Sequence, residues 1–273
     1  GRAVPRGPGG EMLTIEAIER IKALAAARGP LLVASDLDGT LAPIVANASE
    51  ARVPPGTLAV LDRIAQKAKV AVITGRDLNT ARRMVPVEGV DVVGSHGLEA
   101  SFDDPLIPGV NRVALSAALE QVEQQVITAV PSSFLHIERK AVSTAFHFRK
   151  APDLEGPLRR ALATLPEGLR LREGKMVLEV LPNANAGKGV ALTALIRRYR
   201  AKSLLVLGDD ATDVAMFEAA LEASRKDGLH VLLVGVAGGR ETPPRIVELA
   251  DLVVNSPAEA LEALETLARA LGV

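Results

Sequence analysis

Short apolar runs alternate with amphipathic segments along most of this chain. Between residue 12 and about residue 99, the runs LLVASD, KVAVIT and VDVVGS are separated by segments with helical periodicity. After about residue 187 the alternation resumes, with SLLVLGD, HVLLVGV and DLVVN as the apolar runs. Continuous apolar runs separated by helices are typical of a parallel β-sheet that helices cover on both faces, so the pattern predicts an α/β fold with a parallel-sheet core.

The pattern changes between residues 106 and 182. A long amphipathic helix is expected first (VALSAALEQVEQQVITAV), followed by two extended stretches joined like a hairpin around Lys140 and Ala141. A helix over about residues 153–165 and two short strands complete the segment. We therefore predict a smaller α+β domain over residues 106–182, inserted into a core formed by residues 11–105 and 183–273. The Gly-, Pro- and Arg-rich residues 1–10 are expected to be disordered.

Composition and charge exclude several classes of function. Lys and Arg total 32 against 33 for Asp and Glu, so no net positive field exists to hold nucleic acid or an anionic membrane. The chain has no cysteine, which excludes disulfides, thiolate catalysis and cysteine-ligated metals but leaves oxygen-ligated metals open. No apolar run is long enough to span a bilayer and no secretory signal is evident, so a cytoplasmic location is expected.

Polar residues follow the apolar runs where a parallel sheet binds its ligands, beyond the carboxyl ends of the strands. Asp36 and Asp38 follow LLVAS, Thr74 follows KVAVI, and Lys188 opens a helix after the inserted segment. Three more carboxylates follow SLLVL: Asp209, Asp210 and Asp213. A single Asp after a strand is usually a turn or cap residue. Several carboxylates converging on one sheet edge instead need a cation, and Mg²⁺ is the natural choice for oxygen ligands.

The paired aspartates also suggest phosphoryl transfer. Asp36 is placed to attack phosphorus and form an aspartyl phosphate, provided that a metal and a cation cancel the repulsion between the two anions. Asp38 can then protonate the leaving oxygen and later deprotonate the water that cleaves the intermediate. Glycine at position 39 permits the tight turn that this arrangement requires.

Four motifs, DLDGTL, ITGR, GKG and GDDATD, resemble in sequence and order those of haloacid-dehalogenase-superfamily phosphatases. The resemblance implies a Rossmann-like core and identifies the inserted segment with the larger cap domain of that superfamily. It implies Asp36 as nucleophile, Asp38 as general acid and base, Thr74 as a hydroxyl donor to the phosphoryl group, and Lys188 as the group that steadies charge. The implied Mg²⁺ site comprises Asp36, the backbone carbonyl of Asp38, Asp209, Asp210 and Asp213. Which of Asp210 and Asp213 contacts the ion directly stays open.

Longer stretches resemble the trehalose-6-phosphate phosphatase family: DLDGTLAPI, GSHGLE, IERKAVSTAFHFR, MVLEVLPNANAGKGVAL and GDDATDVAMF. The resemblance covers about residues 30–260. It implies hydrolysis of trehalose 6-phosphate to trehalose and inorganic phosphate, and a functional link to a trehalose-phosphate synthase. The substrate-binding residues that it implies are Gly75, Arg76, His96, Glu99, Glu138, Lys140, Ser143 and Glu179.

Several alternatives stay open at this point. The chain could be a phosphatase of another sugar phosphate, a phosphomutase, or a catalytically silent sugar-phosphate sensor, although a pure binder needs no acid and base beside a nucleophile. Glu138, Lys140 and Glu179 could be solvated charges on an exposed face, and His96 could be structural. Leu37, between the paired aspartates, should point away from the site. Aromatic residues make up only 2% of the chain, so specificity should depend on polar contacts.

Overall fold

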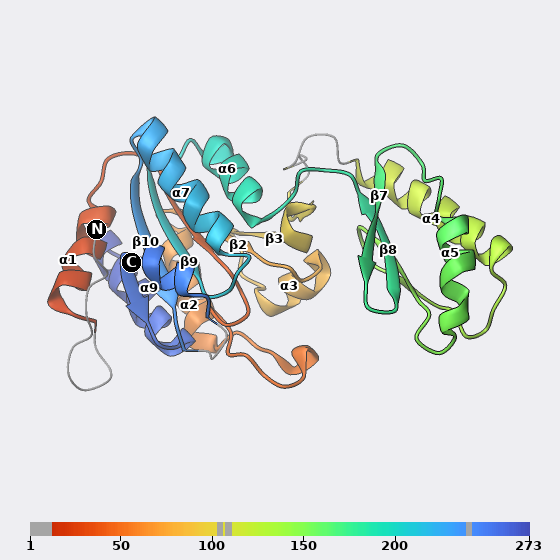
Figure 1. Ribbon diagram of the computed structural model, residues 1–273. Helices are drawn as coiled ribbons and strands as arrows, with labels where there is room; N and C mark the ends of the chain where they lie inside the picture. Colours follow the sequence, from red (N-terminus) through yellow and green to blue (C-terminus); the bar gives the residue numbers. More distant parts are fainter. Residues whose placement is uncertain (1–12, 103–105, 107–110, 239–241) are drawn as a thin grey trace. The chain divides into compact units, whose positions relative to one another are not determined.

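Figure 1 shows the computed structural model of the chain, which describes residues 13–102, 106, 111–238 and 242–273. The chain forms two compact units, Gly1–Leu106 with Ala186–Val273, and Ile107–Asn185. The disorder predicted for residues 1–10 concerns positions outside the described residues. Assignment of the two units as catalytic core and cap stays a prediction.

The larger unit alternates strands and helices as the sequence predicts. Its strands are β1 (Leu31–Ser35), β2 (Lys69–Ile73), β3 (Val90–Gly94), β4 (Glu99–Ala100), β9 (Ser203–Gly208), β10 (His230–Val236) and β11 (Leu252–Val254). Its helices are α1 (Ile15–Ala25), α2 (Pro55–Ala65), α3 (Leu78–Met84), α6 (Lys188–Tyr199), α7 (Val214–Asp227), α8 (Pro244–Leu249) and α9 (Pro257–Leu271), with short 3₁₀ turns η1 (Ala48–Glu50) and η2 (Ser95–Gly97).

Within the described residues these strands form one sheet in the order β11-β10-β9-β1-β2-β3-β4. Neighbouring strands are parallel except at the edge, where β4 pairs antiparallel with β3. The predicted α/β class with a parallel core sheet is confirmed. The short strand β4 and the six-residue helix α8 were not predicted, because segments this short carry little periodic signal.

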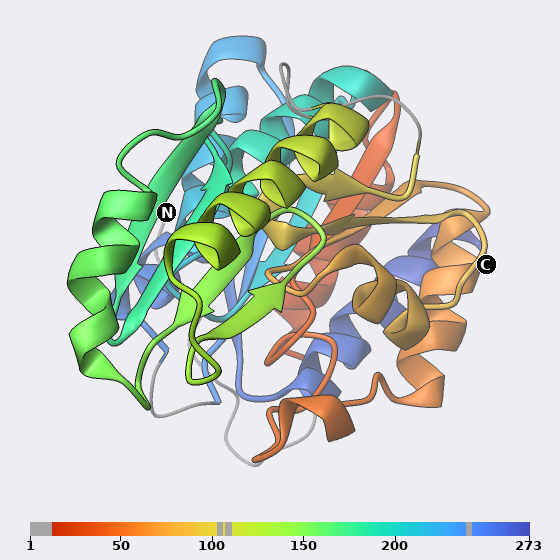
Figure 2. The ribbon, with the colours of Figure 1, turned by 90° about the vertical axis from the view of Figure 1, so that its right-hand side faces the viewer.

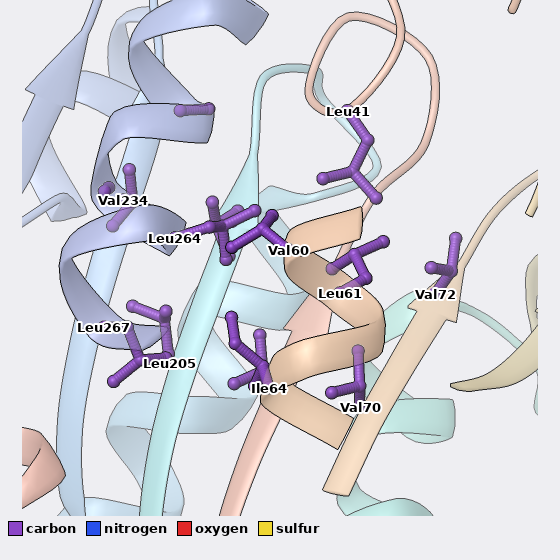
Figure 3. Close-up of a cluster of buried hydrophobic side chains, with 14 of the residues drawn as sticks. Leu41, Val60, Leu61, Ile64, Val70, Val72, Leu205, Val234, Leu264 and Leu267 are labelled. Atoms are coloured by element: carbon purple, nitrogen blue, oxygen red, sulfur yellow. The ribbon is translucent and has the colours of Figure 1, made fainter. Parts of the chain in front are cut away.

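Apolar side chains at alternate positions of the strands form two buried apolar layers, one on each face of this sheet. Val33, Val72 and Leu205 pack with α1, α2 and α9, whereas Ala34, Ile73 and Val206 pack with α6 and α7. Figure 3 shows part of the first layer, where α2 and α9 meet over β2, β9 and β10. Each fully buried Leu, Ile or Val contributes about 1.5–3 kcal/mol relative to an exposed one, so the two layers fix the strands whose ends carry the polar residues.

The smaller unit is an antiparallel sheet with helices on one face. It contains α4 (Arg112–Ala129), β5 (His136–Arg139), β6 (Thr144–His147), η3 (Pro152–Leu154), α5 (Glu155–Ala161), β7 (Leu169–Gly174) and β8 (Val177–Pro182), and its strand order is β5-β6-β8-β7. Figure 2 shows α4 in yellow-green and α5 in green on the near side of this sheet. The predicted hairpin is present, since β5 and β6 pair antiparallel across a turn closed by Lys140 N–H donating to the Ser143 carbonyl at 2.8 Å.

The helix predicted over residues 153–165 is shorter than expected. Its α-helical part ends at Ala161 and is preceded by the 3₁₀ turn η3. Beyond Ala161 the chain leaves the α-helical pattern, and the Gln125 side-chain amide donates to the carbonyls of Ala161 and Thr164. Among the helices of the described residues, none has both the length and the apolar character needed to cross a membrane.

Candidate active site

The candidate site lies where three neighbouring strands end. Asp36, Thr74 and Asp209 directly follow β1, β2 and β9, and β1 is hydrogen-bonded between the other two strands. Strand order reverses at β1, which is the position where open α/β sheets bind ligands. A cavity of about 630 Å³ lies there, lined by Asp36, Asp38, Ile44, Val45, Ala51, Thr74, Gly75, Arg76, His96, Lys188, Asp209, Asp210 and Thr242. The predicted residues of the larger unit all line this cavity, apart from Asp213 and Glu99.

Lys188 joins two buried aspartates at the floor of the site. Its Nζ donates to Asp36 Oδ1 at 2.6 Å and to Asp213 Oδ1 at 2.8 Å, and all three side chains are at most 4% exposed. Burial, followed by repulsion from Asp213, holds the pKa of Asp36 well above its usual range. Burial lowers the pKa of Lys188, but the charges of Asp36 and Asp213 outweigh it and the net direction is upward. The lysine is thus held protonated beside the predicted nucleophile.

Asp209 completes a carboxylate triad with Asp36 and Asp213, in which one oxygen from each lies within 4.8 Å of the others. Thr40 Oγ1 donates to Asp209 Oδ1 at 2.7 Å and fixes its orientation. Position 39 must be glycine, because φ is +86° there and an added Cβ would lie 2.2 Å from Asp209 Oδ2. Burial, together with the charges of Asp213 and Asp210, raises the pKa of Asp209 to about 6.

The triad fits a divalent cation on chemical grounds. Lys188 pairs with Asp36 and Asp213 of this triad, so one ammonium group only partly compensates the charged forms of the three acids. Burial raises the pKa of Asp213 as well, and a cation among the three carboxylates would favour their ionised forms. Oxygen donors without cysteine or histidine select hard cations.

Two other predicted metal residues keep their carboxylates out of this triad. Asp38 is held by Arg76 in a bidentate pair, with Nε to Oδ2 and Nη2 to Oδ1 both at 2.6 Å. Asp210 Oδ1 accepts from Thr212 N–H and Oγ1, both at 2.7 Å, and thus shapes its own loop. Burial raises the pKa of Asp210, but the charge of Lys188 and these local hydrogen bonds outweigh it and the net direction is downward. The backbone carbonyl of Asp38 remains the predicted ligand.

The loop after β2 is packed tightly against the segment Ser95–Gly97. Thr74 is 1% exposed and its Oγ1 accepts from Arg76 N–H at 3.1 Å. A Cβ on Gly75 would lie 2.7 Å from the His96 ring, so glycine is required for this approach. Leu37, by contrast, is fully buried in the apolar layer, as the sequence predicts.

Glu99 occupies a different environment from the one expected of a sugar contact. Its side chain lies outside the cavity lining and is 3% exposed, and Oε2 accepts from Ser95 Oγ at 2.6 Å and from Leu78 N–H at 3.1 Å. Both donors belong to the larger unit.

In the smaller unit, three of the predicted sugar-binding residues form one cluster. Glu179 Oε1 accepts from Ser143 Oγ at 2.7 Å and from Lys140 Nζ at 3.3 Å. Its Oε2 accepts from Arg172 Nε at 3.1 Å and from the Arg172 Nη2. Burial favours the neutral acid, but the hydrogen bonds from Ser143 and Arg172 and the charge of Lys140 hold the pKa of Glu179 below its usual value.

Glu138 shares the sheet face of this cluster without bonding to Glu179. Strand register places Glu138 and Glu179 on either side of Ala145, with Arg172 opposite Glu179. Residues directly opposite in an antiparallel sheet point to the same face, so all three charged side chains lie on the face away from Thr144 and Phe146. Glu138 Oε2 lies 2.9 Å from His147 Nε2.

Comparison with known proteins identifies the family. Residues 34–243 match the family model described as trehalose-phosphatase. The chain belongs to the trehalose-phosphatase family. A relative from Sinorhizobium fredii, named "Probable trehalose-phosphate phosphatase", is 32% identical over 205 residues, which cover 72% of this chain and 75% of the relative. The trehalose-phosphate phosphatase of Mycobacterium avium is 31% identical over 248 residues, covering 85% of this chain but 61% of the relative.

Solved structures agree with this trehalose-phosphatase fold. The trehalose-6-phosphate phosphatase of Aspergillus fumigatus aligns over 92% of this chain and 97% of its own, with a TM-score of 0.63 and 24% identity. At that identity the likeness supports the α/β core with an inserted α+β unit, and the assignment of individual residues depends on the geometry described above.

Three contacts in this chain were not predicted from the sequence: Thr40 with Asp209, Arg76 with Asp38, and Arg172 with Glu179. Thr40 lies within the DLDGTL motif, so the motif itself could have indicated it. Arg172 is seven residues before Glu179 on an adjacent strand, and only the register of β7 with β8 reveals the pair.

Proposed function

We propose that the chain is a Mg²⁺-dependent phosphatase that hydrolyses trehalose 6-phosphate to trehalose and inorganic phosphate through a phospho-Asp36 intermediate. The observation that carries this proposal is the buried bridge from Asp36 through Lys188 to Asp213, beside Asp209 and in a cavity that Asp38 also lines. A protein that only senses sugar phosphates has no use for an acid and base two residues from a nucleophile.

In the first step a carboxylate oxygen of Asp36 attacks phosphorus, and the bond from phosphorus to the sugar oxygen breaks. Asp38 donates a proton to that leaving oxygen, so trehalose departs as a neutral alcohol. Lys188 holds Asp36 in place and offsets the negative charge that gathers between carboxylate and phosphate.

In the second step Asp38 takes a proton from water as the water oxygen attacks phosphorus. The bond between phosphorus and the Asp36 oxygen breaks, which releases inorganic phosphate and restores both aspartates. Arg76 donates to both oxygens of Asp38 and thereby fixes the position of this side chain at the cavity wall.

Asp36, Asp209, Asp213 and the backbone carbonyl of Asp38 are the residues proposed to hold Mg²⁺. When bound, the ion supplies positive charge that draws the phosphoryl group toward the carboxylates and neutralises them. The functional link to a trehalose-phosphate synthase and the cytoplasmic location stay predictions.

A phosphate-release assay over a panel of sugar phosphates, with Mg²⁺ or with EDTA, tests this proposal. Trehalose 6-phosphate should give a kcat/KM at least about tenfold above those of sucrose 6-phosphate and glucose 6-phosphate, and EDTA should remove the activity with all three substrates. Preference for another sugar phosphate would reassign the substrate. Transfer of phosphate between sugar positions without release would indicate a mutase.

We further propose that the smaller unit is the cap and binds the sugar through Glu138, Lys140 and Ser143, with Glu179 as their common anchor. Lys140 and Ser143 both donate to one oxygen of Glu179, so their positions are fixed relative to each other. A disaccharide presents many hydroxyls, and polar groups placed in this way discriminate where an apolar pocket cannot.

Replacing Lys140 with alanine should impair trehalose 6-phosphate hydrolysis far more than hydrolysis of p-nitrophenyl phosphate. We expect kcat/KM for the sugar phosphate to fall by about 10–100-fold, because a charged hydrogen bond is lost, and kcat/KM for the aryl phosphate to change by less than about twofold. Steady-state kinetics on both substrates measure this. Lys150→Ala, at another exposed lysine of the same unit, is the matched control. Equal losses on the two substrates would contradict a sugar-binding role.

A further inference from the structure

The segment between β3 and β4 has an unusual backbone. Ser95, His96 and Gly97 have φ values of 49°, 54° and 104°, so three consecutive residues lie in the left-handed region. That region is unfavourable for residues with a Cβ, and two of the three carry one. Such a conformation persists only where its surroundings enforce it, and it is concentrated at functional sites.

Glu99 supplies part of that enforcement. Its buried Oε2 accepts from Ser95 Oγ at 2.6 Å, at the start of the segment, and from the N–H of Leu78, the first residue of α3, at 3.1 Å. One carboxylate oxygen therefore ties the left-handed segment to the start of the helix that follows the Thr74 loop.

Backbone hydrogen bonds join the same two segments directly. Ser95 N–H donates to the Arg76 carbonyl at 2.7 Å, and His96 N–H donates to the Thr74 carbonyl at 3.0 Å. The His96 ring consequently packs on Gly75, where any Cβ would collide with it, and lines the cavity with Asp36 and Asp38. The position of this imidazole thus depends on the left-handed segment.

We propose that Glu99 is a positioning residue that acts through His96, and that the His96 imidazole contacts the phosphoryl end of the substrate. This inference rests on the proposed phosphatase function but not on which sugar phosphate is hydrolysed. Glu99 itself does not touch the substrate. The Glu99 carboxylate is buried and accepts from Ser95 and Leu78, whereas His96 lies beside the Thr74 loop and lines the cavity with the nucleophile.

Comparison of Glu99→Ala with Glu99→Gln on two substrates tests the positioning role. Glu99→Ala should lower kcat by roughly tenfold or more, and by the same factor for trehalose 6-phosphate and for p-nitrophenyl phosphate, because the displaced group serves the phosphoryl end. Glu99→Gln keeps an acceptor oxygen for Ser95 and Leu78 and should lose clearly less. A rise in KM for the sugar phosphate alone would make Glu99 a sugar ligand and overturn the proposal. Equal losses in the Ala and Gln variants would also overturn it.

NMR signals of the histidine ring nitrogens test the contact between His96 and the phosphoryl end directly. If His96 were purely structural, adding phosphate would not shift its signals. The chain has four histidines, and His96→Gln identifies the signal of interest. In the wild type, inorganic phosphate with Mg²⁺ should shift the His96 ring signals and leave those of His230 unchanged. In Glu99→Ala the same titration should leave the His96 signals unshifted. A His96 signal that ignores phosphate in the wild type would refute its contact with the phosphoryl end.

Ser95→Gly provides a second variant in case Glu99→Ala fails to fold. Glycine accepts the left-handed backbone and removes only the hydroxyl that Glu99 holds, so the fold should persist. We expect a smaller loss of kcat, again equal on both substrates, and no loss at all would overturn the proposal. Because phosphate binding is read by NMR, failure of this inference is distinguishable from absence of trehalose 6-phosphate hydrolysis in the wild type.

Discussion

Replacing Asp36 with asparagine should abolish turnover and leave the chain folded. The amide cannot attack phosphorus as a carboxylate does, so no aspartyl phosphate can form. We expect kcat to fall by about three orders of magnitude or more, which corresponds to roughly 4 kcal/mol of lost transition-state stabilisation. Phosphate release from both trehalose 6-phosphate and p-nitrophenyl phosphate measures the effect.

The same replacement should not reduce stability. In the wild type Asp36 is buried beside Asp213 and Asp209, and burial together with the charge of Asp213 raises its pKa. A carboxyl whose pKa is higher in the folded than in the unfolded chain destabilises the folded state once the pH exceeds its pKa in the unfolded chain. At neutral pH the charge of Asp36 therefore opposes folding. The asparagine carbonyl can still accept from Lys188, which also keeps Asp213 at 2.8 Å.

Thermal unfolding in metal-free buffer at neutral pH checks this second half of the prediction. The melting temperature of Asp36→Asn should equal or exceed that of the wild type. Asp62→Asn, at an exposed position of α2, is the control and should change neither activity nor stability. Near-normal turnover in Asp36→Asn would contradict the aspartyl-phosphate mechanism. A large loss of stability would show that the buried bridge is needed for folding.

The position of the site could be predicted because it depends on topology. Apolar runs mark buried strands, and parallel strands present their carboxyl ends at one edge, so residues following β1, β2 and β9 had to lie near one another. Asp36 and Asp209 are 173 positions apart, with Thr74 between them in the sequence. They lie close together because parallel neighbouring strands end at the same edge of the sheet. The α/β class follows from the same periodicity.

The hydrogen-bond partner of each side chain in the site could not be predicted in this way. Nothing in the sequence says that Asp38 pairs with Arg76 rather than facing the carboxylate triad, because the direction of each side chain is set by the tight turn after β1. Glu99 belongs to the GSHGLE motif, from which the sequence predicts substrate-binding residues. Its burial depends on the left-handed turn that precedes it. A left-handed backbone at Ser95 and His96 goes against local preference and is enforced only by tertiary contacts.

Replacing Asp38 with asparagine should separate the two steps of the reaction. A sugar alkoxide is a poor leaving group that needs a proton from Asp38, whereas p-nitrophenolate leaves without one. Hydrolysis of trehalose 6-phosphate should therefore fall by roughly 100- to 10,000-fold. With p-nitrophenyl phosphate the nucleophile Asp36 should still be phosphorylated, but the intermediate should persist because no base activates the water.

Rapid mixing with p-nitrophenyl phosphate shows this as a burst. Asp38→Asn should release nitrophenolate in an amount matching the enzyme, followed by a much slower steady rate, and Asp36→Asn should give no burst. The asparagine oxygen retains one acceptor for Arg76, so the loop after β1 should keep its position. Absence of a burst in Asp38→Asn, with equal losses on both substrates, would mean that Asp38 is needed to form the phosphoenzyme itself.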